Sequence, residues 1–219
     1  MNKFFLIIIL SMMACGGLFA QQTNYWSFND DNKIPDVGAA TLTTSYTGIG
    51  VGVEVFSAGS ALNALSGFPA GDALTYIDYV NVFSDHTMII SGLDFTGQQD
   101  VNLSFAWMSD QIFQIGEIAL IDYDIGGGWI GAQVIPLPTA AFTIQSFSFG
   151  GALDNQGSVS IRLQNLSVFE VGTTLIYDNV LITSAIPESS PVALLLGSLV
   201  ILGGAIFLRR YRQTSATAR

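Results

Sequence analysis

The stretch VNLSF (residues 101–105) alternates apolar and polar side chains, so one of its faces is apolar and the other polar. A repeat of two is typical of a β-strand that has one face in a core and the other in water. The same alternation runs through FTIQSFSF (142–149), with a change of register, and VSIRL (159–163). These stretches predict half-buried antiparallel strands.

Further strand-like runs occupy most of the chain between residues 25 and 183, and turn-forming residues separate them. Glycine, threonine, serine and aromatic residues are frequent, and no helical period persists over three turns. We therefore predict an all-β fold, a two-sheet β-sandwich closed as a jelly roll. The predicted strands are 25–29, 40–44, 51–57, 74–83, 87–93, 101–108, 115–123, 129–135, 142–149, 158–164 and 175–183.

Both ends of the chain have the pattern of targeting segments. Residues 1–20 combine Lys3, an apolar stretch from Phe4 to Ala14 and a small-residue site at Ala20, which predicts a secretory signal peptide cut after Ala20. An alternative takes Cys15 as the lipidated residue of a lipoprotein signal. Near the other end, 17 apolar residues without a charge (192–208) predict a transmembrane helix at the short limit of length.

The segment left between these ends, residues 21–185, predicts one strongly acidic domain. It has two basic residues, Lys33 and Arg162, against 16 acidic ones, a net charge of −14. Such a charge disfavours binding to nucleic acid and to anionic membrane surfaces. Cys15 is the only cysteine of the chain, so cleavage at Ala20 would leave no disulfide and no thiolate metal site.

The C-terminal segment 186–219 resembles the PEP-CTERM sorting signal of bacterial proteins. It has a Pro-Glu turn, then the apolar run, then a basic cluster that the positive-inside bias places in the cytoplasm. The family usually has Pro-Glu-Pro, whereas this chain has serine at the third position. The resemblance implies recognition by an exosortase-like enzyme in the membrane and release to the cell surface or extracellular matrix; a permanent membrane anchor is the alternative. The residues that carry it are Pro187, Glu188, Ser189, Arg209, Arg210 and Arg212.

Four short motifs make the domain resemble galactose-binding-like and lectin-like jelly rolls, which often precede such tails. They are WSFND (26–30), VNLSFAW (101–107), DN (154–155) and IYDNV (176–180). In those folds the first and last strands pair, and a calcium ion often lies where they meet. The resemblance implies Asn29, Asp30 and Asp178 as calcium ligands, since calcium prefers oxygen. Alternatively, Asp178 caps a turn and residues 29–32 form a solvated loop.

Carbohydrate binding would require exposed aromatic rings with polar groups beside them. Trp129 is the first candidate because Gly126-Gly127-Gly128 places it at the edge of a loop. Tyr76 and Tyr79 are two further candidates, on opposite faces of a predicted strand. Trp26 and Trp107 lie within apolar alternation and are expected in the core.

The sequence offers little for catalysis. His86, the only histidine, is expected at the surface or in a turn, without the partners that a catalytic group needs. Glu117 and Asp122 are five residues apart and so point to opposite sides of a regular strand, which prevents them from flanking one glycosidic bond. We predict a non-catalytic surface or matrix protein with a structural or adhesive role. A carbohydrate-binding module is the alternative, possible partners include extracellular polysaccharide, and a glycan hydrolase fits least well.

Overall fold

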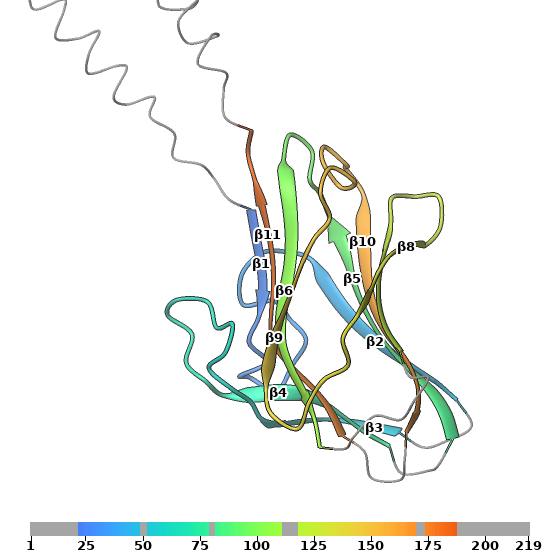
Figure 1. Cartoon of the computed structure of the whole chain (residues 1–219). Helices are drawn as coiled ribbons and strands as arrows, with labels where there is room; N and C mark the ends of the chain where they lie inside the picture. Colours follow the sequence, from blue (N-terminus) through green and yellow to red (C-terminus); the bar gives the residue numbers. More distant parts are fainter. Residues whose placement is uncertain (1–21, 49–51, 79–81, 111–117, 170–173, 188–219) are drawn as a thin grey trace, which may run out of the picture. The chain divides into compact units, whose positions relative to one another are not determined.

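The protein folds as two packed antiparallel β-sheets, which confirms the predicted two-sheet β-sandwich (Figure 1). The computed structural model describes residues 22–48, 52–78, 82–110, 118–169 and 174–187. In these ranges there are strands and loops but no helix. The described residues up to Ile186 belong to one compact unit. The strands are β1 (Gln22–Trp26), β2 (Thr41–Gly48), β3 (Gly52–Ala58), β4 (Asp72–Asp78), β5 (Val82–Leu93), β6 (Gln99–Ser109), β7 (Ile118–Asp124), β8 (Ile130–Ile135), β9 (Thr143–Ser148), β10 (Val159–Phe169) and β11 (Thr174–Ala185).

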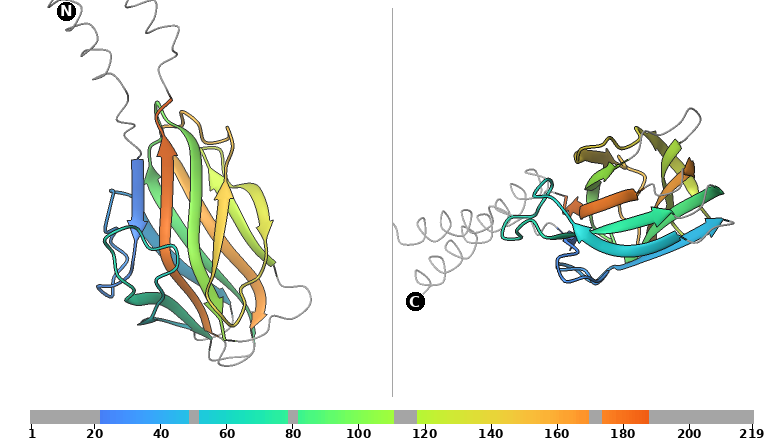
Figure 2. Two further views of the ribbon diagram at one scale, coloured as in Figure 1. Left: turned by 60° about the vertical axis from the view of Figure 1, so that its left-hand side comes forward. Right: turned by 90° about the horizontal axis from the view of Figure 1, so that it is seen from below.

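The first sheet, here called the β11 sheet, has the order β3-β4-β11-β6-β9. β4 pairs with the first half of β11, and β1 pairs with its second half, from Gln22 opposite Ser184 to Trp26 opposite Val180. The pairing of the first and last strands is therefore confirmed, and Figure 2 shows β1 alongside β11. The second sheet, the β10 sheet, has the order β2-β5-β10-β7-β8.

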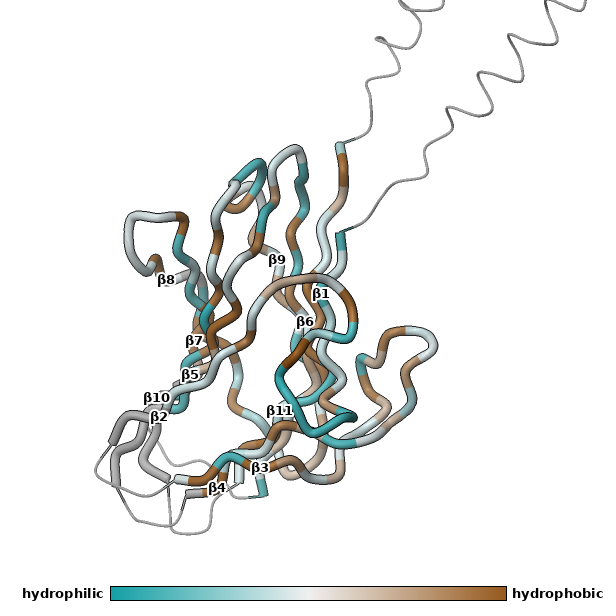
Figure 3. The backbone as a smooth tube through the Cα atoms, turned by 180° about the vertical axis from the view of Figure 1, so that it is seen from behind, coloured by the Kyte–Doolittle hydropathy of each residue, from teal (hydrophilic) through white to brown (hydrophobic). Residues whose placement is uncertain are grey.

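The core lies between the two sheets and is rich in aromatic side chains. Val101, Leu103 and Phe105 of β6 are fully buried while Asn102 between them is exposed, as the alternation predicts. Trp26 and Trp107 are also fully buried, which confirms their expected place in the core. Hydrophilic and hydrophobic residues alternate along much of the traced chain (Figure 3). Burial of such rings is the main stabilising contribution to a sandwich of this kind.

One predicted strand is wrong in its extent. The run 74–83 belongs to two strands, because β4 ends at Asp78 in the β11 sheet and β5 begins at Val82 in the β10 sheet. Residues 73–83 contain neither glycine nor proline, and Asp78 and Asn81 alone were too weak a turn signal to mark the break.

Candidate functional site

Trp129 lies at the tip of the β10 sheet, on the turn that joins β7 to β8. Gly126 and Gly128 have positive φ angles of 97° and 101°, which only glycine adopts without strain. The Asp124 side chain holds this turn, since its Oδ1 accepts hydrogen bonds from the backbone N–H groups of Gly126 (2.7 Å) and Gly128 (3.0 Å). The turn leaves the Trp129 indole 38% exposed, as its predicted place at a loop edge requires.

A half-buried ion pair lies against the Trp129 ring. Arg162 of β10 lies directly opposite Asp122 of β7. The Nε and Nη2 atoms of Arg162 donate to Oδ2 of Asp122 at 2.9 and 2.5 Å, and Asp122 is only 5% exposed. The guanidinium carbon lies 4.4 Å from the centroid of the Trp129 ring. A cation–π contact with a cation that is itself fixed by a carboxylate holds the indole in one orientation.

Polar side chains extend from this aromatic position across the outer face of the β10 sheet. Ile161 and Leu163 of β10 point into the core, so Ser160, Arg162 and Gln164 point outward. Gln164 lies opposite Thr87 of β5, and Thr87 lies opposite Ser45 of β2. We call the surface around Trp129 the Trp129 face; its exposed or half-buried residues are Thr43, Ser45, Trp129, Ser160, Arg162 and Gln164, and Thr87 and Asp122 lie buried beneath them.

The other two aromatic candidates differ from the prediction. Tyr76 is 4% exposed and points into the core, where its ring lies 4.7 Å from that of His86 and 6.1 Å from that of Tyr177. Tyr76 therefore does not offer a ring to a surface ligand, because it alternates with Leu74 on the inner side of β4. Tyr79 lies outside the described residues.

Asp178 and the neighbouring Asn179 hold the loop between β3 and β4. The register of β11 is irregular after Asp178, and Asn179 has a φ of 50°. At this irregularity the side chains of Asp178 and Asn179 both contact the loop. Oδ2 of Asp178 accepts from the backbone N–H of Ser60 at 2.6 Å. Nδ2 of Asn179 donates to the carbonyl groups of Ser60 and Leu62, each at 2.9 Å. Asp178 thus anchors a loop from a buried position.

Of the other two predicted calcium ligands, Asn29 contacts the same loop. Asn29 donates from Nδ2 to the carbonyl of Pro69 at 3.0 Å, whereas Asp30 is exposed. The backbone N–H of Gly59 closes the base of the loop on the carbonyl of Gly71 at 2.7 Å. Within the described ranges no three His, Cys, Asp or Glu side chains gather as a metal site would need. Nδ2 of Asn29 and Oδ2 of Asp178 bond the loop, and calcium binding at Asn29, Asp30 and Asp178 stays a prediction.

Removal of the Asp178 charge should stabilise the protein at neutral and higher pH. Burial raises the pKa of Asp178 from 3.8 to about 6, against the lowering effect of its hydrogen bond from Ser60. Because the pKa is higher in the folded state, this group favours folding below pH 4, and that contribution is lost as the pH rises through 6. Asp178→Asn keeps an acceptor oxygen, so the free energy of unfolding at pH 8 should rise by roughly 2 kcal/mol, with a much smaller difference at pH 4.

Chemical denaturation of both proteins at pH 4 and pH 8 measures this difference. Asp30→Asn removes the same charge from an exposed site and should change the stability by less than about 0.5 kcal/mol. A variant Asp178→Asn that is less stable than the wild type at pH 8 would show that the bond to Ser60 outweighs the desolvation of the carboxylate.

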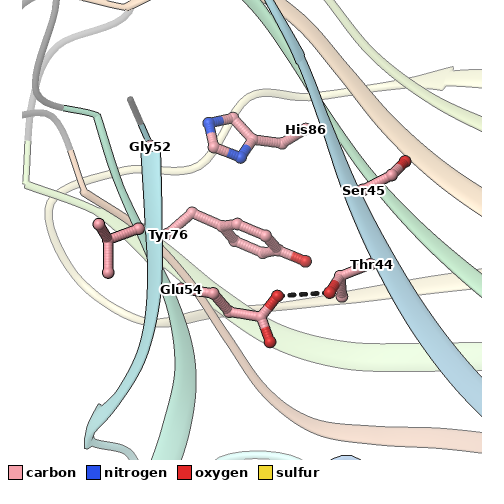
Figure 4. A pocket seen from close by; sticks show the side chains of 7 residues that line it. Thr44, Ser45, Gly52, Glu54, Tyr76 and His86 are labelled. Atoms are coloured by element: carbon pink, nitrogen blue, oxygen red, sulfur yellow. Dashed lines mark hydrogen bonds between the residues drawn. The ribbon is translucent and has the colours of Figure 1, made fainter. Parts of the chain in front are cut away.

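The prediction for His86 is wrong, since this residue is 3% exposed and lies inside the sandwich on β5. It lines a pocket between the two sheets, shown in Figure 4. The pocket residues come from four strands: Thr44, Ser45, Gly52, Val53, Glu54, Tyr76 and His86. Sequence reasoning missed this pocket because its residues converge through the pairing of β2 with β5, the pairing of β3 with β4 and the packing of the two sheets on each other.

Most of the predicted targeting residues lie outside the described ranges, including Ala20, Glu188, Ser189 and the three arginines at 209, 210 and 212. The segment 192–208 is also outside them, and Pro187 is exposed at their end. In the part of the chain that the structure describes, no helix is long and apolar enough to span a bilayer. Glu117 is likewise outside, and Asp122 is bound to Arg162.

The fold of this chain is similar to the folds of several solved structures. No family model matches the chain, and no curated protein matches it. A tailspike protein 4 domain of bacteriophage CBA120 is 16% identical with a TM-score of 0.45; the match covers 64% of this chain but 19% of that one.

Two carbohydrate-binding modules are also similar. The CBM22-1 xylan-binding domain of Xyn10C from Paenibacillus barcinonensis is 12% identical with a TM-score of 0.43, covering 75% of this chain and 94% of that one. The family 11 module from Clostridium thermocellum is 13% identical with a TM-score of 0.43, covering 73% and 94%. Likenesses this distant carry no conclusion about the ligand of this chain.

Proposed function

We propose that this protein is an exported, non-catalytic surface or matrix protein that adheres to polysaccharide through the Trp129 face. The observation that carries the proposal is the exposed indole fixed over the Arg162–Asp122 pair. Aromatic rings bind the apolar faces of sugar rings, and neighbouring hydroxyl and amide groups bind the sugar hydroxyls. A ring that is already immobile loses little entropy on binding, so its position favours recognition.

The net charge of the domain favours a neutral polysaccharide over an anionic one. The segment 21–185 has a net charge of −14, so an anionic chain such as a uronate polymer would be repelled. Lys33 binds Glu54 at 2.7 Å and Arg162 binds Asp122, so both basic residues of the segment are already paired. A neutral polysaccharide therefore fits this face better than an acidic one.

The carboxyl groups of the pocket and of the Trp129 face are not arranged for glycoside hydrolysis. Hydrolysis of a glycosidic bond generally uses two carboxyl groups about 5 to 9.5 Å apart on either side of the bond. Of the residues that line the described pocket, only Glu54 is acidic, and Lys33 pairs with it. On the Trp129 face the Asp122 carboxylate binds Arg162 and is almost fully buried. These arrangements suit binding rather than general acid–base chemistry.

We further propose that the predicted signal peptide and the PEP-CTERM-like tail deliver the protein to the cell surface or matrix. Intact mass of the protein from membranes and from the medium tests it. Processing by an exosortase-like enzyme predicts a released form that begins at Gln21 and ends near Pro187. A mass that runs through Arg219 and is found only in the membrane fraction would instead show a permanent anchor.

Trp129→Ala should weaken retention of the full chain on a neutral polysaccharide about tenfold or more, since stacking of one ring contributes on the order of 1 to 2 kcal/mol. The measurement is affinity electrophoresis in gels that contain xylan, β-glucan or galactan, with a detergent that has no sugar head group.

Ile144→Ala is the matched control, because Ile144 is 47% exposed on β9 of the other sheet. Its retention should equal that of the wild type. Unchanged retention of Trp129→Ala on a polysaccharide that binds the wild type would remove the Trp129 face from consideration.

A further inference from the structure

Exposed apolar side chains gather on the edge strand β8 and on the turn before it. Of the nine large apolar residues that are exposed within the described ranges, four lie within these ten positions: Ile125, Trp129, Ile130 and Val134. Val134 is 57% exposed and lies opposite Leu120 of β7. Ile130 is 42% exposed and lies opposite Tyr123, whose ring packs against the core. Since Leu120 and Tyr123 are on opposite sides of β7, β8 has an exposed apolar side chain on each of its faces.

The outer edge of β8 lacks two features that usually keep edge strands apart. β8 is the last strand of the β10 sheet, at the right-hand side of Figure 1, and among the described strands it pairs with β7 alone. Its sequence, IGAQVI, contains neither a charge nor a proline. The N–H and C=O groups of such an edge are free to pair with a strand of another chain. A bulge between Gly131 and Gln133 shortens the regular part, so a contact made there should be small.

The distribution of charge indicates what can approach this edge. The segment 21–185 has a net charge of −14, which repels a second copy from most of the surface. Residues 125–153, which include β8, contain no charged residue at all. Two copies that meet at β8 therefore bring uncharged strands together and keep their acidic residues apart. A basic partner would gain no opposite charge at β8 and would bind better elsewhere on the domain.

Identical strands also suit each other in geometry. In an antiparallel pair, the N–H and C=O groups of one strand meet the same groups of its copy across a twofold axis. The exposed apolar side chains on both faces of β8 would then lie next to those of the added strand, and such cross-strand pairs stabilise a sheet. Edge strand, apolar side chains and absence of charge thus all favour the same occupant, a second copy of this chain.

We propose that two copies of this chain pair through β8, edge to edge and antiparallel, so that their β10 sheets form one continuous sheet. The twofold axis of such a pair is perpendicular to the sheet, so both outer faces point to the same side. The two Trp129 faces then form one surface, and a single polysaccharide chain can bind both of them. This gain in retention rests on the proposed function, whereas the pairing of the strands does not.

Sedimentation velocity of the full chain in detergent measures the pairing without any polysaccharide. With increasing concentration the wild type should change from one chain to two, with a dissociation constant on the order of 10 to 100 μM, as befits a small interface. Val134→Glu places a charge at the free edge and, because Val134 is exposed, should fold normally. It should weaken the pairing at least tenfold.

Ile144→Glu is the matched control, because Ile144 is 47% exposed on β9, an edge strand of the other sheet. It makes the same kind of change and should leave the pairing as it is in the wild type. Both variants keep the ends of the chain, so association through the ends would affect them equally. The pairing is overturned if the wild type stays a single chain up to about 200 μM, or if Val134→Glu pairs no more weakly than Ile144→Glu does.

Retention on polysaccharide separates this proposal from the proposed function. Trp129→Ala should still pair, because the Trp129 ring lies over Arg162 of β10, two strands in from the free edge. Val134→Glu should still be retained, but about tenfold more weakly than the wild type, because each chain then binds alone. A wild type that pairs but is not retained by any neutral polysaccharide would overturn the proposed function and leave the pairing intact.

Discussion

Arg162→Ala should lower the free energy of unfolding by about 3 kcal/mol, because it leaves the Asp122 carboxylate buried without its partner. Two hydrogen bonds to Oδ2 of Asp122 disappear, and the Trp129 ring loses the cation beneath it. The variant should therefore also lose polysaccharide retention. Chemical denaturation and affinity electrophoresis of the same preparation measure the two effects.

Two further variants separate the loss of stability from the loss of support for the Trp129 ring. Lys33→Ala removes the other basic residue of the segment from a more exposed ion pair and should cost no more than about 1 kcal/mol. Asp122→Asn combined with Arg162→Ala removes the stranded charge and should recover part of the stability, but not the support of Trp129. A loss below 1 kcal/mol for Arg162→Ala would contradict a buried Asp122 carboxylate that depends on Arg162.

Trp107→Ala should lower the free energy of unfolding by about 4 kcal/mol, a typical effect of the loss of a large buried aromatic ring. Trp107 is fully buried on β6 and packs against Phe105 and Tyr177, with ring centroids 5.4 and 6.0 Å away. The cavity would lie at the centre of the sandwich, between its two sheets. Chemical denaturation measures the loss.

Trp107→Phe is the matched control, since Nε1 of Trp107 is buried and has no hydrogen-bond partner within the described residues. The smaller ring gives up no hydrogen bond and should cost less than half as much as alanine. A loss for Trp107→Ala as small as that of the exposed Ile144→Ala, within about 0.5 kcal/mol, would contradict this placement of the core.

The strands could be predicted from the sequence because alternation records which side of a strand faces the core. Residues 101–105 show this directly, since Val101, Leu103 and Phe105 are buried and Asn102 is exposed. The boundary between β4 and β5 could not be predicted, because neither glycine nor proline marks it and Asp78 and Asn81 are a weak signal within an apolar run. The burial of Tyr76 also escaped prediction, since its strand has no purely apolar face in the sequence.

Only part of the candidate site could be predicted from the sequence. The glycines before Trp129 indicated a turn, and they do form one. Its support by Arg162 was not visible, since Arg162 and Asp122 are 40 residues apart and meet through the register of β7 and β10. His86 likewise meets Tyr76 across the two sheets, a contact that no local pattern records.

The most direct test of the central claim follows the tryptophan indole N–H signals while the full chain is titrated with a retained polysaccharide. The chain has three tryptophans, of which Trp26 and Trp107 are fully buried and Trp129 is exposed. Trp129→Phe identifies the Trp129 signal by its absence. Binding through the Trp129 face predicts that this signal shifts to saturation while the other two stay in place. Retention of the polysaccharide with an unmoved Trp129 signal would contradict it.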